Sequence, residues 1–364
     1  MAPNILQPLH CFGHSPNCGV RDTVFALLDH SYICTSGRSL TINSQAAEDG
    51  ECEFLPGLED WEKVTTVCRS RDMLYLAVCT AYYVQDMDTD DGSLRGKKTA
   101  ASAHGGEHQD REFNSSIIIY KLPLANEKKN GKQQKKQKQN DAADTHTDTE
   151  DHENTAVINV EKRVQTPKKI RTLYYTPKHE NTNDIFCESS FSPDGKMLYV
   201  QTSAPDYTLL LYDWGRSKLL AQLSLQVEAQ RISSPQDTNI SRICTCGPDH
   251  LCFWAVGIGG RDLKACDPVK GLDAAVEGRE VSDCAYLYDN ASGGRVVATT
   301  TGGNVLIVDE HEVIQVWRNA HDNEEITCCL PFTDGVTGAA TFGDDDDVAG
   351  FITLGGEYER TNLF

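Results

Sequence analysis

The chain has 364 residues, enough for a large core in one or two domains. Its 34 basic and 54 acidic residues give a net charge of −20, which argues against a general nucleic-acid binder, because such proteins must neutralise phosphates. The N-terminal residues lack the apolar core of a secretory signal, and no run reaches the length of a membrane span, so no membrane partner is expected. The fourteen cysteines are therefore expected to be free thiols in a reducing compartment.

Short strand-like segments begin near the N-terminus. Residues 22–29, 31–37 and 39–44 form a first, partial group of such segments. A second group follows, with strands expected over residues 63–70, 73–84, 115–122 and 170–176. These segments are rich in β-branched and aromatic residues and are bounded by turn-forming residues, which is the pattern of short antiparallel strands.

Two polar segments interrupt the second group. Residues 85–114 are rich in Asp, Gly, His and Ser, and residues 126–154 join a lysine-rich run to an acidic one. Neither segment can bury enough apolar surface to offset the entropy of ordering. Because each is flanked by strand-like segments, both are predicted to be disordered insertions within a single domain that spans residues 1–364.

The second half of the chain repeats. The stretch FCESSFS-PDG-KMLYVQTS-APDY-TLLLYDW-GRSK-LLAQLSL, residues 186–225, contains four strands joined by short turns. Units of the same order follow over residues 228–266 and 281–317, and a further unit covers residues 324–354. A period near forty residues with four strands per unit is typical of WD-type propeller blades. The sequence thus predicts an all-β fold, a WD40-type β-propeller of about six to seven blades.

Possible metal ligands are better explained by packing. The spacing of the group near the N-terminus matches no standard zinc finger; its members are His10, Cys11, His14 and Cys18. Cys244 and Cys246 alternate along a strand without a second pair to complete a site, whereas the adjacent Cys328 and Cys329 would face opposite sides. The GDDDD run at residues 343–347 lacks the spacing of a calcium loop and is expected to be a solvated turn between two strands. No metal site and no cofactor is predicted.

Other conspicuous residues have structural interpretations. Asp194, Asp206 and Asp237 recur beside turns, where a carboxylate can accept hydrogen bonds from nearby backbone amides. His321 is expected to make a hydrogen bond across a blade, and Trp214 and Trp317 are expected to pack. No nucleophile elbow, phosphate-binding loop or HExxH helix is present, so the chain is predicted not to be an enzyme.

The lysine-rich run is the feature with a possible recognition role. It contains Lys128, Lys129, Lys132, Lys135, Lys136 and Lys138. A positive arm on a negative protein could bind an acidic polymer surface, for instance the acidic tails of tubulin. The simpler interpretation, which the sequence favours, is a solvated loop whose positive charge is partly neutralised by the acidic run that follows it.

Several of these stretches resemble one known family. The stretch FSPDGKMLYVQTSAPDYTLLLYDWGRSKLLAQL resembles a blade of the cilia- and flagella-associated WD-repeat proteins, and HCFGHSPNCGVRDTVFALLDHSYICTSG, SPQDTNISRICTCGPDHLCFW and GGNVLIVDEHEVIQVW resemble other parts of their propeller. The resemblance implies a non-enzymatic scaffold of the axoneme that docks or regulates inner dynein arms. Its implied partners are dynein-arm components, doublet microtubules and related WD-repeat scaffolds.

The chain also departs from that family's plan. It stops after one propeller and has no heptads, so it is either a shortened paralogue or a fragment, and roles of a coiled-coil tail do not carry over. Two other functions stay open. One is a general cytosolic WD40 scaffold, for example in trafficking or ribosome assembly, and the other is a hydrolase built on a propeller.

Overall fold

Antiparallel strands account for most of the ordered chain. The computed structural model describes residues 24–27, 31–36, 39–43, 52–58, 63–83, 113–123, 166–175, 185–225, 227, 229, 231–235, 241–248, 250–287, 294–333, 349–355 and 360–363. The first three sheets consist of β1 (Val24–Ala26), β2 (Tyr32–Ser36), β3 (Ser39–Asn43), β4 (Cys52–Phe54); β5 (Lys63–Arg69), β6 (Tyr75–Tyr83), β7 (Phe113–Lys121), β8 (Lys168–Tyr174); and β9 (Phe186–Phe191), β10 (Met197–Thr202), β11 (Thr208–Asp213), β12 (Lys218–Ser224).

The other three sheets follow in chain order. They consist of β13 (Arg231–Ser233), β14 (Arg242–Gly247), β15 (His250–Val256), β16 (Leu263–Ala265); β17 (Val281–Tyr286), β18 (Val296–Thr300), β19 (Val305–Val308), β20 (Val313–Trp317); and β21 (Ile326–Thr333), β22 (Ala349–Gly355), β23 (Arg360–Leu363). Short helices are η2 (Trp214–Arg216), η3 (Ile258–Gly260) and α1 (Leu272–Val276).

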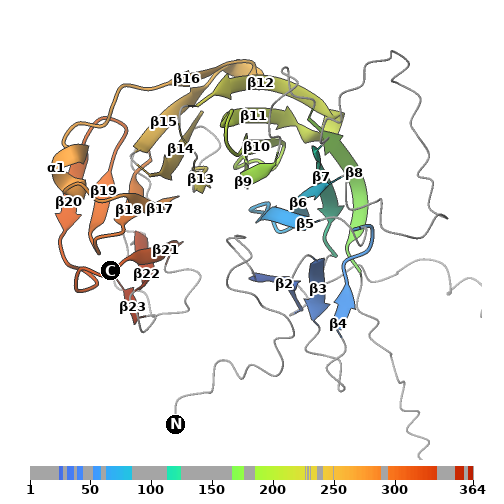
Figure 1. Cartoon of the computed structure of the whole chain (residues 1–364), viewed down its shortest axis with the longest axis horizontal. Coiled ribbons are helices and arrows are strands. Elements are labelled where there is room, and N and C mark those ends of the chain that lie inside the picture. Colours follow the sequence, from blue (N-terminus) through green and yellow to red (C-terminus); the bar gives the residue numbers. More distant parts are fainter. Residues whose placement is uncertain are drawn as a thin grey trace, which may run out of the picture.

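The six sheets form a β-propeller. Within every sheet each strand pairs with its neighbour in the sequence, so each sheet is a simple meander. The sheets follow one another in chain order around a central axis, with β5, β9, β13, β17 and β21 nearest the centre and β4, β8, β12, β16 and β20 at the circumference (Figure 1). The prediction of an all-β propeller is confirmed, and six blades are present in the described part of the chain.

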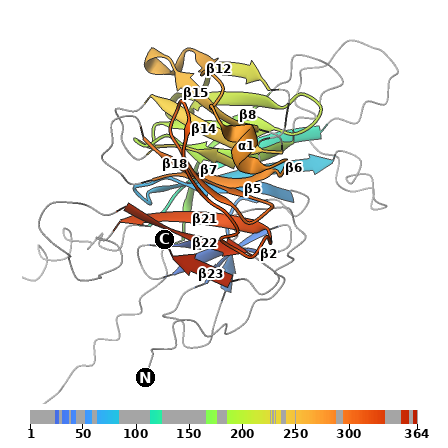
Figure 2. The ribbon, with the colours of Figure 1, turned by 90° about the vertical axis from the view of Figure 1, so that its left-hand side faces the viewer.

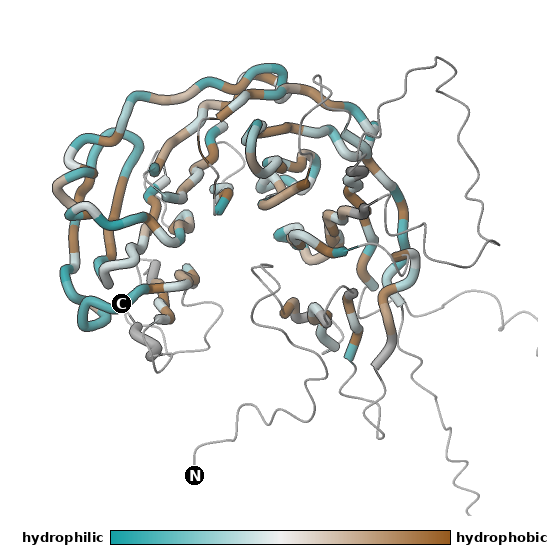
Figure 3. The backbone as a smooth tube through the Cα atoms, in the orientation of Figure 1, coloured by the Kyte–Doolittle hydropathy of each residue, from teal (hydrophilic) through white to brown (hydrophobic). Residues whose placement is uncertain are grey.

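Apolar clusters between consecutive sheets hold neighbouring sheets together, so the second to fifth sheets are packed on both faces. Leu198 and Val200 of β10 join a cluster with the second sheet, whereas Tyr199, between them, joins a cluster with the fourth sheet. Successive side chains of a strand point to opposite faces, so a strand covered on both sides reads as a continuous apolar run. Apolar residues accordingly run along the strands, and hydrophilic residues gather at turns (Figure 3).

Polar side chains of the inner strands link neighbouring sheets near the axis. The hydroxyl oxygens of Thr66 and Ser189 lie 3.4 Å apart, at the boundary of the second and third sheets. The Ser282 hydroxyl in β17 donates a hydrogen bond to the carbonyl of Ile326 in β21. These contacts give the inner strands a fixed mutual register in addition to the apolar packing.

Two long segments interrupt the second sheet, one between β6 and β7 and one between β7 and β8. The strand residues on either side of each segment are paired directly with each other. Tyr83 at the end of β6 pairs with Phe113 at the start of β7, and Lys121 at the end of β7 pairs with Lys168 at the start of β8. The strand β7 thus begins two residues inside the segment predicted as the first insertion. Each long segment starts and returns at one point of a single sheet.

Besides the one-turn helices η2 and η3, three elements were not predicted from the sequence. They are the short strands β4 and β23 and the helix α1. The helix α1 lies beside β20 (Figure 1) and faces the viewer in Figure 2. Its Leu272 and Val276 pack against the same apolar cluster as Val313 and Val316 of β20. In the described part of the chain, no helix has the length and apolar character that crossing a membrane requires.

Candidate protein-interaction surface

Two turns of the second and third sheets have the same hydrogen-bonded structure. In the turn between β9 and β10, the Ser192 hydroxyl donates to Asp194 Oδ1 at 2.7 Å and accepts from the backbone amide of Met197 at 2.9 Å. In the turn between β5 and β6, the Ser70 hydroxyl donates to Asp72 Oδ1 at 2.6 Å and accepts from the Tyr75 amide at 2.9 Å. The spacing Ser-x-Asp therefore builds one rigid turn type twice.

Trp214 connects these two turns. It begins η2 directly after β11, and its indole Nε1 donates a 2.7 Å hydrogen bond to the carbonyl of Gly195. The Tyr75 ring from the second sheet lies 4.7 Å from the Trp214 ring, and the Phe191 ring meets it edge-on at 6.4 Å. Only 9% of Trp214 is exposed, so the predicted packing role is confirmed. We call this group of turns and rings the Trp214 clamp.

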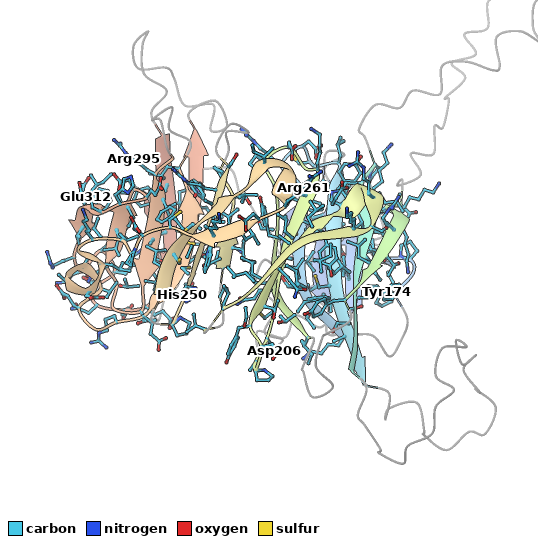
Figure 4. The ribbon with its side chains drawn as sticks, turned by 90° about the horizontal axis from the view of Figure 1, so that it is seen from above. Tyr174, Asp206, His250, Arg261, Arg295 and Glu312 are labelled. Carbon is cyan, nitrogen blue, oxygen red and sulfur yellow. The ribbon has the colours of Figure 1, made fainter. Side chains whose placement is uncertain are left out.

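Two hollows lie on opposite faces of the propeller, one of about 360 Å³ and one of about 530 Å³. The second of these lies over the Trp214 clamp. It is lined by Asp72, Leu74, Tyr75, Asp194, Gly195, Lys196, Asp213, Trp214, Gly215 and Arg216. This hollow lies on the face that carries the turns after the first and third strands of each sheet. Arg261 and Arg295 point toward the same face in Figure 4, whereas Asp206 and His250 lie toward the opposite face.

The charged side chains around this hollow form hydrogen bonds and ion pairs within the turns that line it. Burial alone would raise the pKa of Asp194, but hydrogen bonds from Ser192 and from the Lys196 amide outweigh it and hold that pKa below its ordinary value. Lys196 Nζ lies 3.1 Å from Asp194, and Arg216 lies 3.5 Å from Asp213. The carboxylates therefore shape turns, and the arrangement suits contact with a protein surface better than acid–base chemistry.

A buried ion pair and a hydrogen bond to its carboxylate join the fourth, fifth and sixth sheets near the axis. Arg231 of β13 lies 3.3 Å from Asp283 of β17, and both side chains are largely buried. The other carboxylate oxygen of Asp283 accepts a 2.9 Å hydrogen bond from the Cys329 amide in β21. Because each member is satisfied by a partner on a neighbouring sheet, this group stabilises the assembly of blades.

The cysteines behave as packing residues. Cys244 and Cys246 face the same apolar cluster, which Cys284 of β17 also joins. Burial raises the pKa of the Cys244 and Cys246 thiols, and hydrogen bonds from these two thiols lower the pKa of Cys284 below its ordinary value. No disulfide is formed by Cys34, Cys79, Cys244, Cys246, Cys252, Cys266, Cys284 or Cys329. Within the described residues no group of His, Cys, Asp and Glu is arranged to hold a metal ion.

The other predicted residues have mixed outcomes. His321 makes the expected hydrogen bond across its sheet, with Nε2 2.7 Å from Thr353 Oγ1, and Trp317 packs 5.7 Å from the Phe351 ring. Cys329 is buried and Cys328 only partly so, as expected for adjacent residues of a strand.

The expectation for Asp206 is wrong. Among the described residues its carboxylate accepts no hydrogen bond, because the Thr202 hydroxyl accepts the Thr208 amide at 2.8 Å and closes that turn instead. The remaining candidates lie outside the described residues: Asp237, residues 343–347, the group His10, Cys11, His14 and Cys18, and the lysines Lys128, Lys129, Lys132, Lys135, Lys136 and Lys138.

Comparison with known proteins returns microtubule-associated relatives. The chain is 25% identical over 142 residues to echinoderm microtubule-associated protein-like 2 of Mus musculus, a match that covers 38% of this chain and 21% of that protein. It is 27% identical over 145 residues to echinoderm microtubule-associated protein-like 1 of Rattus norvegicus, covering 39% and 17%. The matches thus span about a fifth of the length of these relatives. No protein-family model matches.

Solved propellers are similar at low identity. The β-propeller domain of Cps50 (Swd1) from Myceliophteria thermophila has a TM-score of 0.44 and 12% identity, covering 82% of this chain and 64% of that one. Sqt1 from Chaetomium thermophilum has a TM-score of 0.49 and 10% identity, covering 91% and 65%. Sheet order and relatives together support a WD-repeat family.

Proposed function

We propose that this chain is a non-enzymatic WD-repeat scaffold that associates with the microtubule cytoskeleton through protein–protein contacts. The observation that carries the proposal is the sequence similarity to two relatives whose names describe microtubule-associated proteins. The structure supports a binding role, because the propeller offers two rigid faces and a circumference on which partners can be held at fixed separations.

The finer form of the proposal places the scaffold in the axoneme of cilia and flagella. There it would dock or regulate inner dynein arms and contact doublet microtubules and related WD-repeat scaffolds. The support is the resemblance of residues 191–223 and three other stretches to the cilia- and flagella-associated WD-repeat proteins, most closely to proteins 57 and 44 of that group. Trp214 and the turn from Ser192 to Met197, which form part of the Trp214 clamp, lie within the first of these stretches, and the clamp would present its hollow to such a partner.

The lysine-rich run would add an electrostatic contact. Its six lysines, Lys128, Lys129, Lys132, Lys135, Lys136 and Lys138, would bind acidic tubulin tails, and such a contact weakens as salt is raised.

Co-sedimentation with stabilised microtubules tests the proposal. The intact chain is expected in the pellet, and replacing the six lysines by glutamine is expected to reduce the pelleted fraction and to flatten its dependence on salt. Failure of the intact chain to pellet at low salt would overturn microtubule association.

Location in flagellated cells tests the finer form and separates it from the main alternative. A fluorescently tagged chain is expected along the axoneme. A diffuse cytosolic signal would instead favour the general WD40 assembly scaffold.

A further inference from the structure

The outermost strand of the second sheet differs from the other outer strands in charge. β8 reads KKIRTLY and has three cationic residues, Lys168, Lys169 and Arg171, among its seven positions. The outer strands of the third, fourth and fifth sheets, β12, β16 and β20, read KLLAQLS, LKA and VIQVW. On a chain with a net charge of −20, this concentration of positive charge at one edge is a local exception.

These cations are not neutralised by the described part of the protein. Lys196, Arg216, Lys264 and Arg318 on other sheets each lie beside a carboxylate. In contrast, Lys169 Nζ donates to the Gly57 carbonyl at 3.1 Å, and Arg171 donates to the Ser217 hydroxyl at 2.8 Å. Both partners are uncharged, so the two side chains are positioned while their charge stays uncompensated.

A pair of like charges strengthens this argument. Lys121 of β7 lies directly opposite Lys168 of β8, and both are exposed. Like charges directly opposite each other in a sheet are destabilising. Within the described residues neither amino group has an acidic partner, so folding alone gives no reason for the pair, whereas an anionic ligand would compensate both charges at once.

The same edge also exposes apolar surface. Tyr174, at the other end of β8, is 72% exposed, and Ile170 is 38% exposed. Figure 4 shows Tyr174 at the circumference of the propeller. Among the described residues β8 pairs with β7 alone, so the backbone amides and carbonyls of its outer side are not used in the sheet.

We propose that the outer edge of β8 binds an acidic, extended polypeptide segment of a partner protein by strand addition. The backbone of the segment would pair with β8, its carboxylates would lie beside Lys121, Lys168, Lys169 and Arg171, and an apolar side chain would cover Tyr174. Strand addition gives affinity through main-chain hydrogen bonds and specificity through alternate side chains. The inference rests on the proposed scaffold function, because it names the kind of partner segment that the scaffold would hold.

The probe is a fluorescein-labelled peptide of alternating Glu and Val, seven residues long to match β8, added to the intact chain and followed by fluorescence anisotropy. Replacing Lys121 and Lys168 by glutamine is expected to weaken binding at least tenfold. The matched control replaces Lys218 of β12 and Lys264 of β16, which changes the net charge equally on other outer strands, and is expected to bind as the unaltered chain does. Thermal melts check that all variants fold.

Peptides N-methylated at alternate residues separate backbone pairing from charge attraction. In an added strand only every second peptide amide points toward β8, so methylation in one phase is expected to abolish binding while methylation in the other phase leaves it intact. Equal binding of both methylated peptides, or equal binding of a single-stranded oligonucleotide of the same charge, would overturn the proposal.

Microtubule co-sedimentation of the same variants separates the two proposals. A chain that pellets with microtubules but ignores the peptide would refute strand addition at β8 and leave the scaffold function standing. A chain that binds the peptide in the phase-dependent manner but never pellets would refute microtubule association and retain the edge as a docking site for another acidic partner.

Discussion

Single residues of the Trp214 clamp combine packing with hydrogen bonding. The sequence predicted that Trp214 packs, because an aromatic residue at a strand end commonly does. It did not indicate the hydrogen bond to Gly195, since the two residues lie in different turns of the sheet and meet only after β10 and β11 pair. The indole therefore serves both the apolar cluster and a buried carbonyl.

Replacing Trp214 by phenylalanine is expected to destabilise the protein by about 2 kcal/mol, through a lost hydrogen bond and a partly unfilled space. Urea unfolding measures this change. The control is Tyr75→Phe, which keeps the ring that packs on Trp214 and is expected to change stability by less than about 0.5 kcal/mol. Equal stability of the Trp214 variant and the unaltered chain would refute the clamp.

A second residue gives the fold a pH dependence. His250 lines a hollow of about 360 Å³ on the face opposite the clamp, together with Leu272, Asp273, Val276 and Arg279. Burial lowers the pKa of His250, against a smaller opposing effect of the Pro248 carbonyl.

The sign of the pH effect follows from this lowered pKa. The unfolded chain takes up a proton on this imidazole near pH 6.5, whereas the folded chain does so only at lower pH. The unfolding free energy is therefore expected to fall as the pH drops below about 6.5. In His250→Gln this fall should be shallower, which urea unfolding at a series of pH values can measure. Parallel curves for the two proteins would contradict the assignment.

At the scale of elements, the repeated Ser-x-Asp turns impose the same backbone shape on different residues. The residue after the aspartate adopts positive φ in both turns, 67° at Gly195 and 57° at Met73. Glycine tolerates this region, and a residue with a side chain is strained there.

Two substitutions at this position are thus expected to have opposite effects. Gly195→Ala should cost about 1 kcal/mol, although a methyl group would meet nothing closer than 3.9 Å, because the cost is conformational. Met73→Gly should stabilise the protein by up to about 1 kcal/mol. Thermal and urea unfolding of both variants check the prediction, which changes of the same sign would contradict.

The elements that the sequence predicted well are those with strong local patterns. Strands such as β10 and β11 are continuous apolar runs between recognisable turns, so their positions follow from periodicity. The three-residue strand β4 has no such pattern and forms because β3 offers it an edge. The helix α1 was missed because one helical turn is too short to show periodicity, although Gly271 and Gly278 flank it.

At the scale of the whole molecule, the contacts between sheets depend on how the blades are arranged around the axis of the propeller. Chain order predicts which sheets are neighbours, but the twist of each sheet decides which rows of side chains meet. The buried pair of Arg231 and Asp283 and the proximity of Cys284 to Cys244 and Cys246 could not be predicted for that reason. The positive charge of β8 is visible in the sequence as the run KKIR at the start of the strand. That one side of β8 has no strand partner among the described residues could be known only from the order of the strands in the sheet.

The Asp283 carboxylate should matter to the assembly of three blades. Asp283→Asn is expected to destabilise the protein by about 3 kcal/mol, because Arg231 would keep a largely buried charge without its partner. The control is Asp262→Asn, which breaks an exposed pair with Lys264 and should cost less than about 1 kcal/mol. Urea unfolding followed by tryptophan fluorescence measures both, and similar losses in the two variants would contradict the role of Asp283.

The paired strand ends in the second sheet make this propeller a ready host for grafted domains. Tyr83 and Phe113 are directly opposite, as are Lys121 and Lys168, so any guest whose own termini lie close together could be spliced in at either position without stretching the blade. The two junctions open on opposite faces of the disc, because one follows the second strand of the sheet and the other follows the third. A single chain could therefore display two different cargoes, one above and one below the same rigid plate.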